Sequence, residues 1–417
     1  MSTLEVAYTL NPITPTQVDR FKPIARSVVG NNSSALGFPS KFGGGRSLVS
    51  GGAVTHPEGS LIYYDDRLIS CQPITSTHRN IGASILSRCS GAASNARVTV
   101  FIEIRNRSQA DYYIAAHDFK MILWIDQQLP DCFSGAPPSK HDHEYWIHME
   151  NFPGPVFSTS QDRQELVNVM ASTAVDAATS DGSTSPMSAE QLHENLETIK
   201  RFSEEIDIYQ TYAIARLWNM LLQSRVINKY GTPEARLDRF ITISERPPKF
   251  TGIYEKVNKL MLHTPHAHLV RCARAWADRI AYTQEWRKLK ARNEQEWQQV
   301  MHLACVLIMR VKYPKSTECV LTALCSFSAS LLVNSQSTCS FKVISNFSLL
   351  TGLGSLASVY YLLNESQNLG HHAADASTYF QEREEYAYGV QRIAIINAMP
   401  QALLIWGFIF FLAAVLI

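Results

Sequence analysis

The last 25 residues of the chain, Ile393 to Ile417, contain no charged side chain. A helix of that length rises about 38 Å, whereas the hydrocarbon core of a bilayer is about 30 Å thick. Val343 to Asn364 is also uncharged, and it is rich in the Gly, Ser and Ala residues that let membrane helices approach closely. A buried hairpin of a soluble protein is the alternative, but the uncharged terminus argues against it. We therefore predict a C-terminal multi-span α-helical membrane anchor.

Two stretches of the sequence are candidates for the first helix of this anchor. The apolar residues 298–309 are too few to cross a bilayer, and the basic segment Arg310 to Lys315 follows them. We place the first span near 319–341, followed by spans near 343–364 and 393–417; in the other interpretation, 298–309 is a helix end that approaches the membrane. By the positive-inside rule, the soluble part is cytosolic, because this region is preceded by basic residues: Arg287, Lys288, Lys290 and Arg292.

The rest of the chain divides into three parts. Residues 1–54 are rich in Gly and Ser without a regular period, which is typical of a flexible arm. Residues 55–157 read as β-rich and residues 158–297 as helical, ahead of the anchor at 298–417. The expected fold class is α+β, with a small antiparallel β element, then helices, then the anchor. With 38 basic and 37 acidic residues, the chain has no charge excess that would draw it to nucleic acid.

The β element is indicated by alternation and turns. Residues 97–104 (RVTVFIEI) alternate apolar side chains with period two. A turn at 105–111 leads to a return strand around Tyr113, and residues 119–126 give a third strand that ends at Trp124. We expect Trp124 to pack against Tyr113 within one antiparallel hairpin.

The helical part is indicated by caps and spacing. Ser188 with Gln191 has the form of a helix start. A helix at 206–227 carries one apolar stripe, composed of Tyr209, Ala213, Leu217 and Met220. A last helix at 265–297 mixes basic residues with tryptophans, and we expect residues 284–297 to lie within reach of lipid headgroups.

Several of these stretches occur together in one known pattern. They are His56-Pro57-Glu58-Gly59 with Tyr63-Tyr64, then Tyr113, His117 and Trp124, then Tyr145 to Pro153, then Ile214 to Trp218, and the closing AADASTYFQ…IINAMPQALLIWGFIFFLAAVLI. The chain from about His56 onward resembles a family of uncharacterised membrane proteins of mushroom-forming fungi, often labelled WW-domain-like. The resemblance implies a soluble N-terminal region followed by three spans, and it implies no activity.

Tyr113, His117 and Trp124 are the first candidate binding residues. In a WW-like hairpin, a Tyr and a Trp on neighbouring strands form an aromatic groove for the polyproline II helix of a Pro-rich protein ligand. The usual first Trp of such a domain is missing here, so the alternative is that these aromatic residues form the core of a larger β element.

His148 and Glu150 are the second candidate. His141, His143 and His148 have the spacing H-E-x-x-x-H around Glu144, which does not match the H-E-x-x-H of a zinc helix, so we expect no metal and no cofactor. No enzymatic motif was found. We expect a non-catalytic, membrane-anchored interaction or scaffold protein; the alternative is a membrane-tethered enzyme of unrecognised class that uses His141 to Glu150.

The cytosolic orientation predicts the glycosylation state. Asn31-Asn32-Ser33 and Asn364-Glu365-Ser366 match the acceptor pattern but would both face the cytosol. Treatment of the purified chain with an N-glycosidase should therefore leave its mass unchanged, whereas a glycan on Asn31 would require the opposite orientation.

Overall fold

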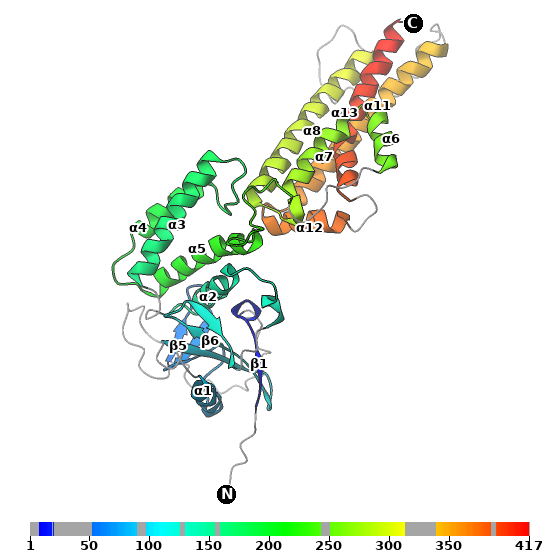
Figure 1. Ribbon diagram of the computed structural model, residues 1–417. Helices are drawn as coiled ribbons and strands as arrows, with labels where there is room; N and C mark the ends of the chain where they lie inside the picture. The colour runs from blue at the N-terminus through cyan, green and yellow to red at the C-terminus, as the bar shows by residue number, and fades with distance from the viewer. Residues whose placement is uncertain are drawn as a thin grey trace, which may run out of the picture. The chain divides into compact units, whose positions relative to one another are not determined.

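The computed structural model describes residues 8–18, 20, 52–89, 97–125, 130–154, 159–242, 251–312, 339–384 and 389–416 (Figure 1). The chain forms two compact units, Met1–Asp238 and Arg239–Ile417, called here the N-terminal and C-terminal units. Their boundary falls inside the region 158–297 that was predicted as a single helical part.

The N-terminal unit contains a mixed seven-stranded sheet in the order β1-β6-β5-β4-β3-β2, with β7 also paired to β6. Its strands are β1 (Thr9–Pro12), β2 (Gly52–Thr55), β3 (Leu61–Asp65), β4 (Leu68–Ser70), β5 (Val98–Ile104), β6 (Gln109–Ala116) and β7 (Met121–Leu123). The predicted antiparallel element is present as β5-β6-β7. The prediction of a small, wholly antiparallel element is nevertheless wrong, because β1 pairs with β6 and β4 with β5 in parallel.

Strand β1 lies in the segment that was predicted as a flexible arm. It pairs along Gln109 to Tyr112 of β6. Just after it, the backbone N–H and hydroxyl of Thr16 donate to the buried carboxylate of Glu144, at 3.1 and 2.8 Å. These contacts attach the start of the chain to residues more than a hundred positions away, which local composition does not reveal.

Both faces of the sheet are covered, and the alternation predicted in β5 is confirmed. Val98, Val100 and Ile102 pack on helix α1 (Ser76–Arg88), whereas Phe101 belongs to the core on the opposite face. No helix was predicted at α1. It passes so close to β4 that a Cβ on Gly82 would lie 2.4 Å from a methyl of Leu68.

Four helices follow on the Phe101 side: α2 (Ser139–Asn151), α3 (Ser160–Thr179), α4 (Ala189–Lys200) and α5 (Ile208–Ile227). The predicted start at Ser188 is confirmed, since its hydroxyl accepts from the Gln191 N–H at 3.2 Å. Helix α2 corrects the prediction that residues 55–157 are β-rich throughout. The stripe predicted on α5 faces the core only in part, because Leu217 packs against the core whereas Tyr209 and Met220 are 54% and 37% exposed. Apolar residues surround this helix, so their spacing does not select a face.

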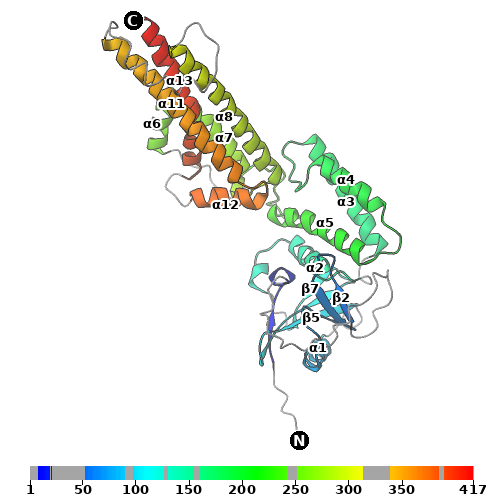
Figure 2. The ribbon, with the colours of Figure 1, turned by 180° about the vertical axis from the view of Figure 1, so that it is seen from behind.

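The C-terminal unit is helical, with α6 (Gly252–Leu260), α7 (Thr264–Ala275), α8 (Thr283–Lys312), α11 (Cys339–Asn368), α12 (Ala373–Glu384) and α13 (Gly389–Leu416). Helices α8, α11 and α13 run side by side in both views (Figures 1 and 2). The helix predicted at 265–297 is interrupted between α7 and α8. Asp278 and Arg279 have φ of 51° and 61° there, in the left-handed region that a continuing helix does not contain.

Two helices in the described part of the chain are long and apolar enough to cross a membrane, at Val343–Asn368 and Gly389–Ala413. They coincide with the predicted spans near 343–364 and 393–417. The span predicted near 319–341 lies almost wholly outside the described residues. Helices α11 and α13 are joined by serine hydroxyls, with Ser348 donating to the Gly407 carbonyl and Ser355 to the Pro400 carbonyl, both at 2.8 Å.

The tryptophans that were expected near lipid headgroups are buried inside the C-terminal unit. The indole N–H of Trp286 donates to the Gly370 carbonyl, and that of Trp297 to the Asn397 carbonyl. The rings of Trp276 and Phe380 stack with centroids 5.1 Å apart. Residues 284–297 therefore use their aromatic side chains to hold the helices together.

Tyr113 and Trp124 belong to the same core, and each also has a ring partner of its own. Tyr113 stacks on its cross-strand neighbour Phe101, with ring centroids 4.9 Å apart. Trp124 packs edge-on against Phe133 at 5.2 Å, and its N–H donates to the Ile13 carbonyl at 2.7 Å.

This geometry predicts a graded response at Trp124. Trp124→Phe keeps a ring against Phe133 but removes the donor to the Ile13 carbonyl, so the free energy of unfolding should fall by about 1 kcal/mol. Trp124→Ala also removes the ring, so the free energy of unfolding should fall by about 2–3 kcal/mol. This is less than for a fully buried Trp, because Trp124 is half-buried. Hydrogen exchange of the β6 amides measures both values. Equal losses in the two variants would show that the ring contributes nothing.

Candidate functional site

Helix α2 brings together residues from separate parts of the N-terminal unit. It lies between the sheet and α5 (Figure 1). The stretches that carry the family resemblance converge on it: the β2–β3 turn at His56, strand β6 at Tyr113, and α5 at Arg216. Two groups of polar side chains result, one buried and one at the surface.

The buried group consists of two histidines and their hydroxyl partners. The Tyr113 hydroxyl lies 3.0 Å from Nδ1 of His148, and the Tyr145 hydroxyl lies 3.2 Å from Nδ1 of His117. Nε2 of His117 also lies 2.9 Å from the Thr99 hydroxyl. The two imidazole rings are neighbours, with centroids 5.8 Å apart.

Burial keeps both imidazoles neutral. It lowers the pKa of His117 to about 3 and holds the pKa of His148 well below its ordinary value. It also raises the pKa of the Tyr113 hydroxyl well above its usual range. The Nε2 atom of His148 has no hydrogen-bond partner among the described residues, which lowers the free energy of unfolding by about 1–3 kcal/mol. These residues form a hydrogen-bonded core.

The surface group, called here the Glu150 cluster, comprises His56, Glu58, Glu150, Tyr212, Arg216 and Asn219. The Glu150 carboxylate accepts from Arg216 at 2.9 Å and from the Asn219 amide at 2.6 Å. The Glu58 carboxylate accepts from the Tyr212 hydroxyl at 2.7 Å and from Arg20 at 2.8 Å. The cluster thus joins α2, α5 and the β2–β3 turn.

Hydrogen bonds determine the tautomer of His56 in this cluster. Its Nδ1 accepts from the Glu58 backbone N–H at 3.1 Å, so its Nε2 carries the proton and donates to the Glu150 carbonyl at 2.8 Å. Burial lowers the pKa of His56, which matches this neutral form. Burial would raise the pKa of Glu58, but the hydrogen bonds from Tyr212 and Arg20 outweigh it, so the pKa lies below its ordinary value. Glu58 is therefore ionised.

The structure separates the residues that were predicted as binding residues. Tyr113, His117 and His148 lie together but are buried, so they form no open aromatic groove. Trp124 is half-buried and packs against the same core as Tyr113, whereas Glu150 belongs to the Glu150 cluster. Tyr212 and Asn219 were missed. Tyr212 lies one turn before Arg216, a spacing that would have indicated a shared face, whereas no sequence signal pointed to Asn219.

No group of three or more His, Cys, Asp or Glu residues in the described part of the chain is placed to hold a metal ion. Comparison with protein-family models, with curated proteins and with solved structures finds no match to this chain. What the chain does must therefore be argued from its own geometry.

Helix α5 presents a continuous outer face beside the Glu150 cluster. Its exposed members recur at helical spacing and are mostly large: Tyr209, Arg216, Met220 and Ile227. Between Ile208 and Ile227 the helix has two arginines and no acidic residue. Tyr, Met and Arg are enriched in protein interfaces.

The neutral histidines predict how stability depends on pH. His117 has a pKa of about 3 when folded and an ordinary value of 6.5 when unfolded, so between these pH values the unfolded chain binds more protons. The free energy of unfolding should therefore fall by about 1.4 kcal/mol per pH unit for this residue as the pH drops below 6.5. His117→Gln should remove this contribution in urea unfolding of residues 1–238 at several pH values.

His193 supplies the matched control, since it is exposed on α4. His193→Gln should keep the full pH dependence. If His117→Gln and His193→Gln show the same slope, the neutral state of His117 is wrong.

Proposed function

We propose that this protein is a membrane-anchored interaction protein. The C-terminal unit crosses a bilayer, and the N-terminal unit binds a partner protein on the outer face of α5. The proposal rests on the contrast between the surroundings of α2 and the outer face of α5 in the N-terminal unit. Its ionisable groups around α2 are buried or joined to one another, whereas α5 leaves a continuous row of large side chains uncovered.

The anchor is supported by the outer surfaces of α11 and α13. Most residues of both helices are not buried within the structure. Large apolar side chains on them are exposed, including Phe347, Leu350, Ile409 and Leu412. Water does not favour such extensive apolar surface, whereas lipid covers it at no loss.

The packing also indicates how α8 lies against the two apolar helices. Residues 286 and 290 of α8 contact residues 369 and 370, which follow α11, whereas Leu307 packs in one core with Val359 and Leu404. The path of α8 therefore leads from the loop side into the depth of α11 and α13. We propose that the end of α8 enters the membrane beside α11 and α13, and that the N-terminal unit lies on the cytosolic side together with α12.

The proposed partner is an amphipathic helix with acidic residues. The α5 face repeats at helical spacing, which suits a second helix laid along it. Its charged side chains are arginines, and Arg216, although paired with Glu150, is half exposed, which suits a partner with carboxylates. The Pro-rich ligand expected from Tyr113, His117 and Trp124 is less well supported, because two of these three residues are buried.

The convergence on α2 also supports the family resemblance. His56, Tyr113, Glu150 and Arg216 come from stretches that are far apart in sequence, yet hydrogen bonds join each of them to α2 or to its partners. We propose that the chain belongs with the fungal membrane proteins that it resembles.

The partner surface is tested with the tagged full-length chain purified from its own membranes. Tyr209→Asp with Met220→Asp places charge in the middle of the α5 face. One protein should co-purify in a fixed ratio with the unaltered chain, and its recovery with the double variant should fall about tenfold or more.

Val175→Asp is the control, because Val175 is similarly exposed but lies on α3. It should retain the partner fully. Equal recovery from all three chains would place the contact elsewhere, and a partner lost from both variants would indicate a general effect of added charge.

A further inference from the structure

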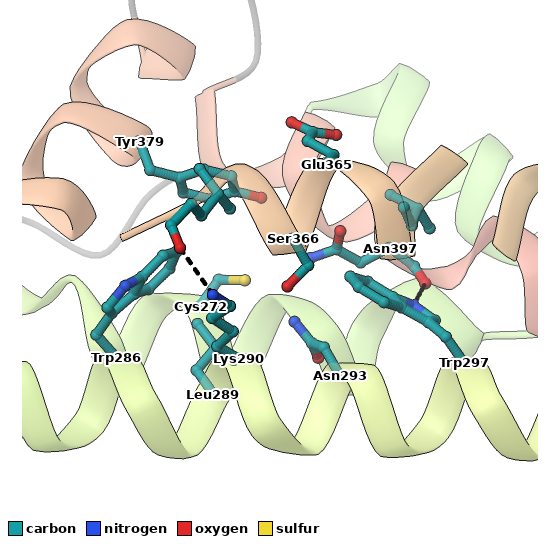
Figure 3. Close-up of a pocket in the computed structure, with 12 residues that line it drawn as sticks. Cys272, Trp286, Leu289, Lys290, Asn293, Trp297, Glu365, Ser366, Tyr379 and Asn397 are labelled. Atoms are coloured by element: carbon teal, nitrogen blue, oxygen red, sulfur yellow. Dashed lines mark hydrogen bonds between the residues drawn. The ribbon is translucent and has the colours of Figure 1, made fainter. Parts of the chain in front are cut away.

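A cavity in the C-terminal unit lies where α8, α11, α12 and α13 meet (Figure 3). The space that a water-sized sphere can occupy in it is about 30 Å³, and the space between its side chains together with the open solvent at its mouth is about 410 Å³. Its walls include the rings of Trp286, Trp297 and Tyr379. Asn293 projects into it from α8 towards Ser366 on α11, and the Lys290 ammonium is hydrogen-bonded to the Leu369 carbonyl (Figure 3).

Lys290 is the unusual member of this cavity. It is only 8% exposed, and its ammonium donates to one acceptor, the Leu369 carbonyl at 2.8 Å. An ammonium has three donors. Among the described residues, no carboxylate pairs with it. Buried charges are normally paired, because burial of an isolated charge is strongly unfavourable.

The neighbouring acidic residues are already engaged. Glu365 lines the cavity, but its carboxylate is paired with Arg383 and points away from Lys290 (Figure 3). Glu294 accepts from the Ser366 hydroxyl at 2.5 Å, and Glu296 accepts from Arg271 at 2.7 Å. Among the described residues, the Lys290 ammonium in this cavity therefore has no carboxylate partner.

The position of the cavity indicates where that anion would come from. Ser366 lies near the end of the apolar span Val343–Asn368, and Asn397 lies early in the span Gly389–Ala413. This is the depth at which apolar helix surface ends and lipid headgroups begin.

We propose that this cavity binds the phosphate of a phospholipid headgroup. Lys290 supplies the positive charge, and the Asn293 amide supplies a further donor. The site rests on the membrane anchorage proposed above. It also gives that anchorage a specific lipid contact at the cytosolic end of the bundle.

Native mass spectrometry and thermal unfolding of the full-length chain in detergent test the site. The ligands are dioleoylphosphatidic acid, dioleoylglycerol, which lacks the phosphate, and inorganic phosphate. Phosphatidic acid should bind and raise the melting temperature, and dioleoylglycerol should do neither. Equal affinity for inorganic phosphate would overturn the lipid assignment in favour of a soluble phosphate.

Variants at position 290 separate binding from helix capping. Lys290→Gln keeps a donor for the Leu369 carbonyl but removes the charge, so the affinity for phosphatidic acid should fall about tenfold or more. Lys290→Arg should retain binding. Lys288→Gln is the control, because the Lys288 side chain is 66% exposed on the same helix. Unchanged affinity in Lys290→Gln would leave Lys290 as a cap of α11 and overturn the proposal.

Two further measurements distinguish a failure of the lipid site from a failure to fold or a failure of the membrane anchor. If Lys290→Gln does not fold, Asn293→Leu should lower the affinity by filling the same cavity, and unaltered binding in that variant would overturn the proposal. Extraction of membranes with sodium carbonate tests the anchorage itself. Release of the chain would contradict the anchor, whereas a retained chain without phosphatidic acid binding would contradict only this site.

Discussion

The N-terminal unit depends on the polar residues of α2 finding partners when the helix is buried. Glu144 and His148 are fully enclosed, and a buried polar group without a hydrogen bond is unfavourable by about 1–3 kcal/mol. Their partners come from distant segments, with Thr16 from the start of the chain and Tyr113 from β6. Glu150, at the end of the helix, is satisfied by α5. Helix α2 thus connects the N-terminal strand, the sheet and the following helices, and the position of each depends on its contacts with α2.

The C-terminal unit is held by a different set of contacts, which suit a bilayer. Serine hydroxyls on α11 donate to carbonyls of α13, and Gly407 leaves room for Leu307 of α8. In lipid, close packing and interhelical hydrogen bonds replace the hydrophobic effect as the source of association. At the loop end, Trp286, Arg287 and Lys290 of α8 donate to carbonyls just beyond the α11 helix. These contacts close the bundle and create the cavity at its polar end.

The proposed binding function agrees with the state of the acid–base groups in the N-terminal unit. The residues with acid–base chemistry, such as His117 and His148, are buried and neutral, and the carboxylates of Glu58 and Glu150 each hold two donors. A general acid or base must reach a substrate, and burial removes these histidines from that role. The α5 face is exposed in contrast, and it includes Tyr and Arg, residue types that contribute strongly to protein interfaces.

Local signals in the sequence determined a substantial part of this structure. The uncharged runs indicated α11 and α13, the alternation of 97–104 indicated β5, and Ser188 with Gln191 indicated the start of α4. Each of these signals depends only on residues a few positions apart. Tertiary structure decided the parallel pairing of β1 with β6, the burial of Tyr113 and His117, and the exposure of Tyr209 and Met220 on α5. Those outcomes depend on contacts between residues up to about a hundred positions apart, and the hydrophobic effect that drives them is non-directional, so no local pattern encodes which surface meets which.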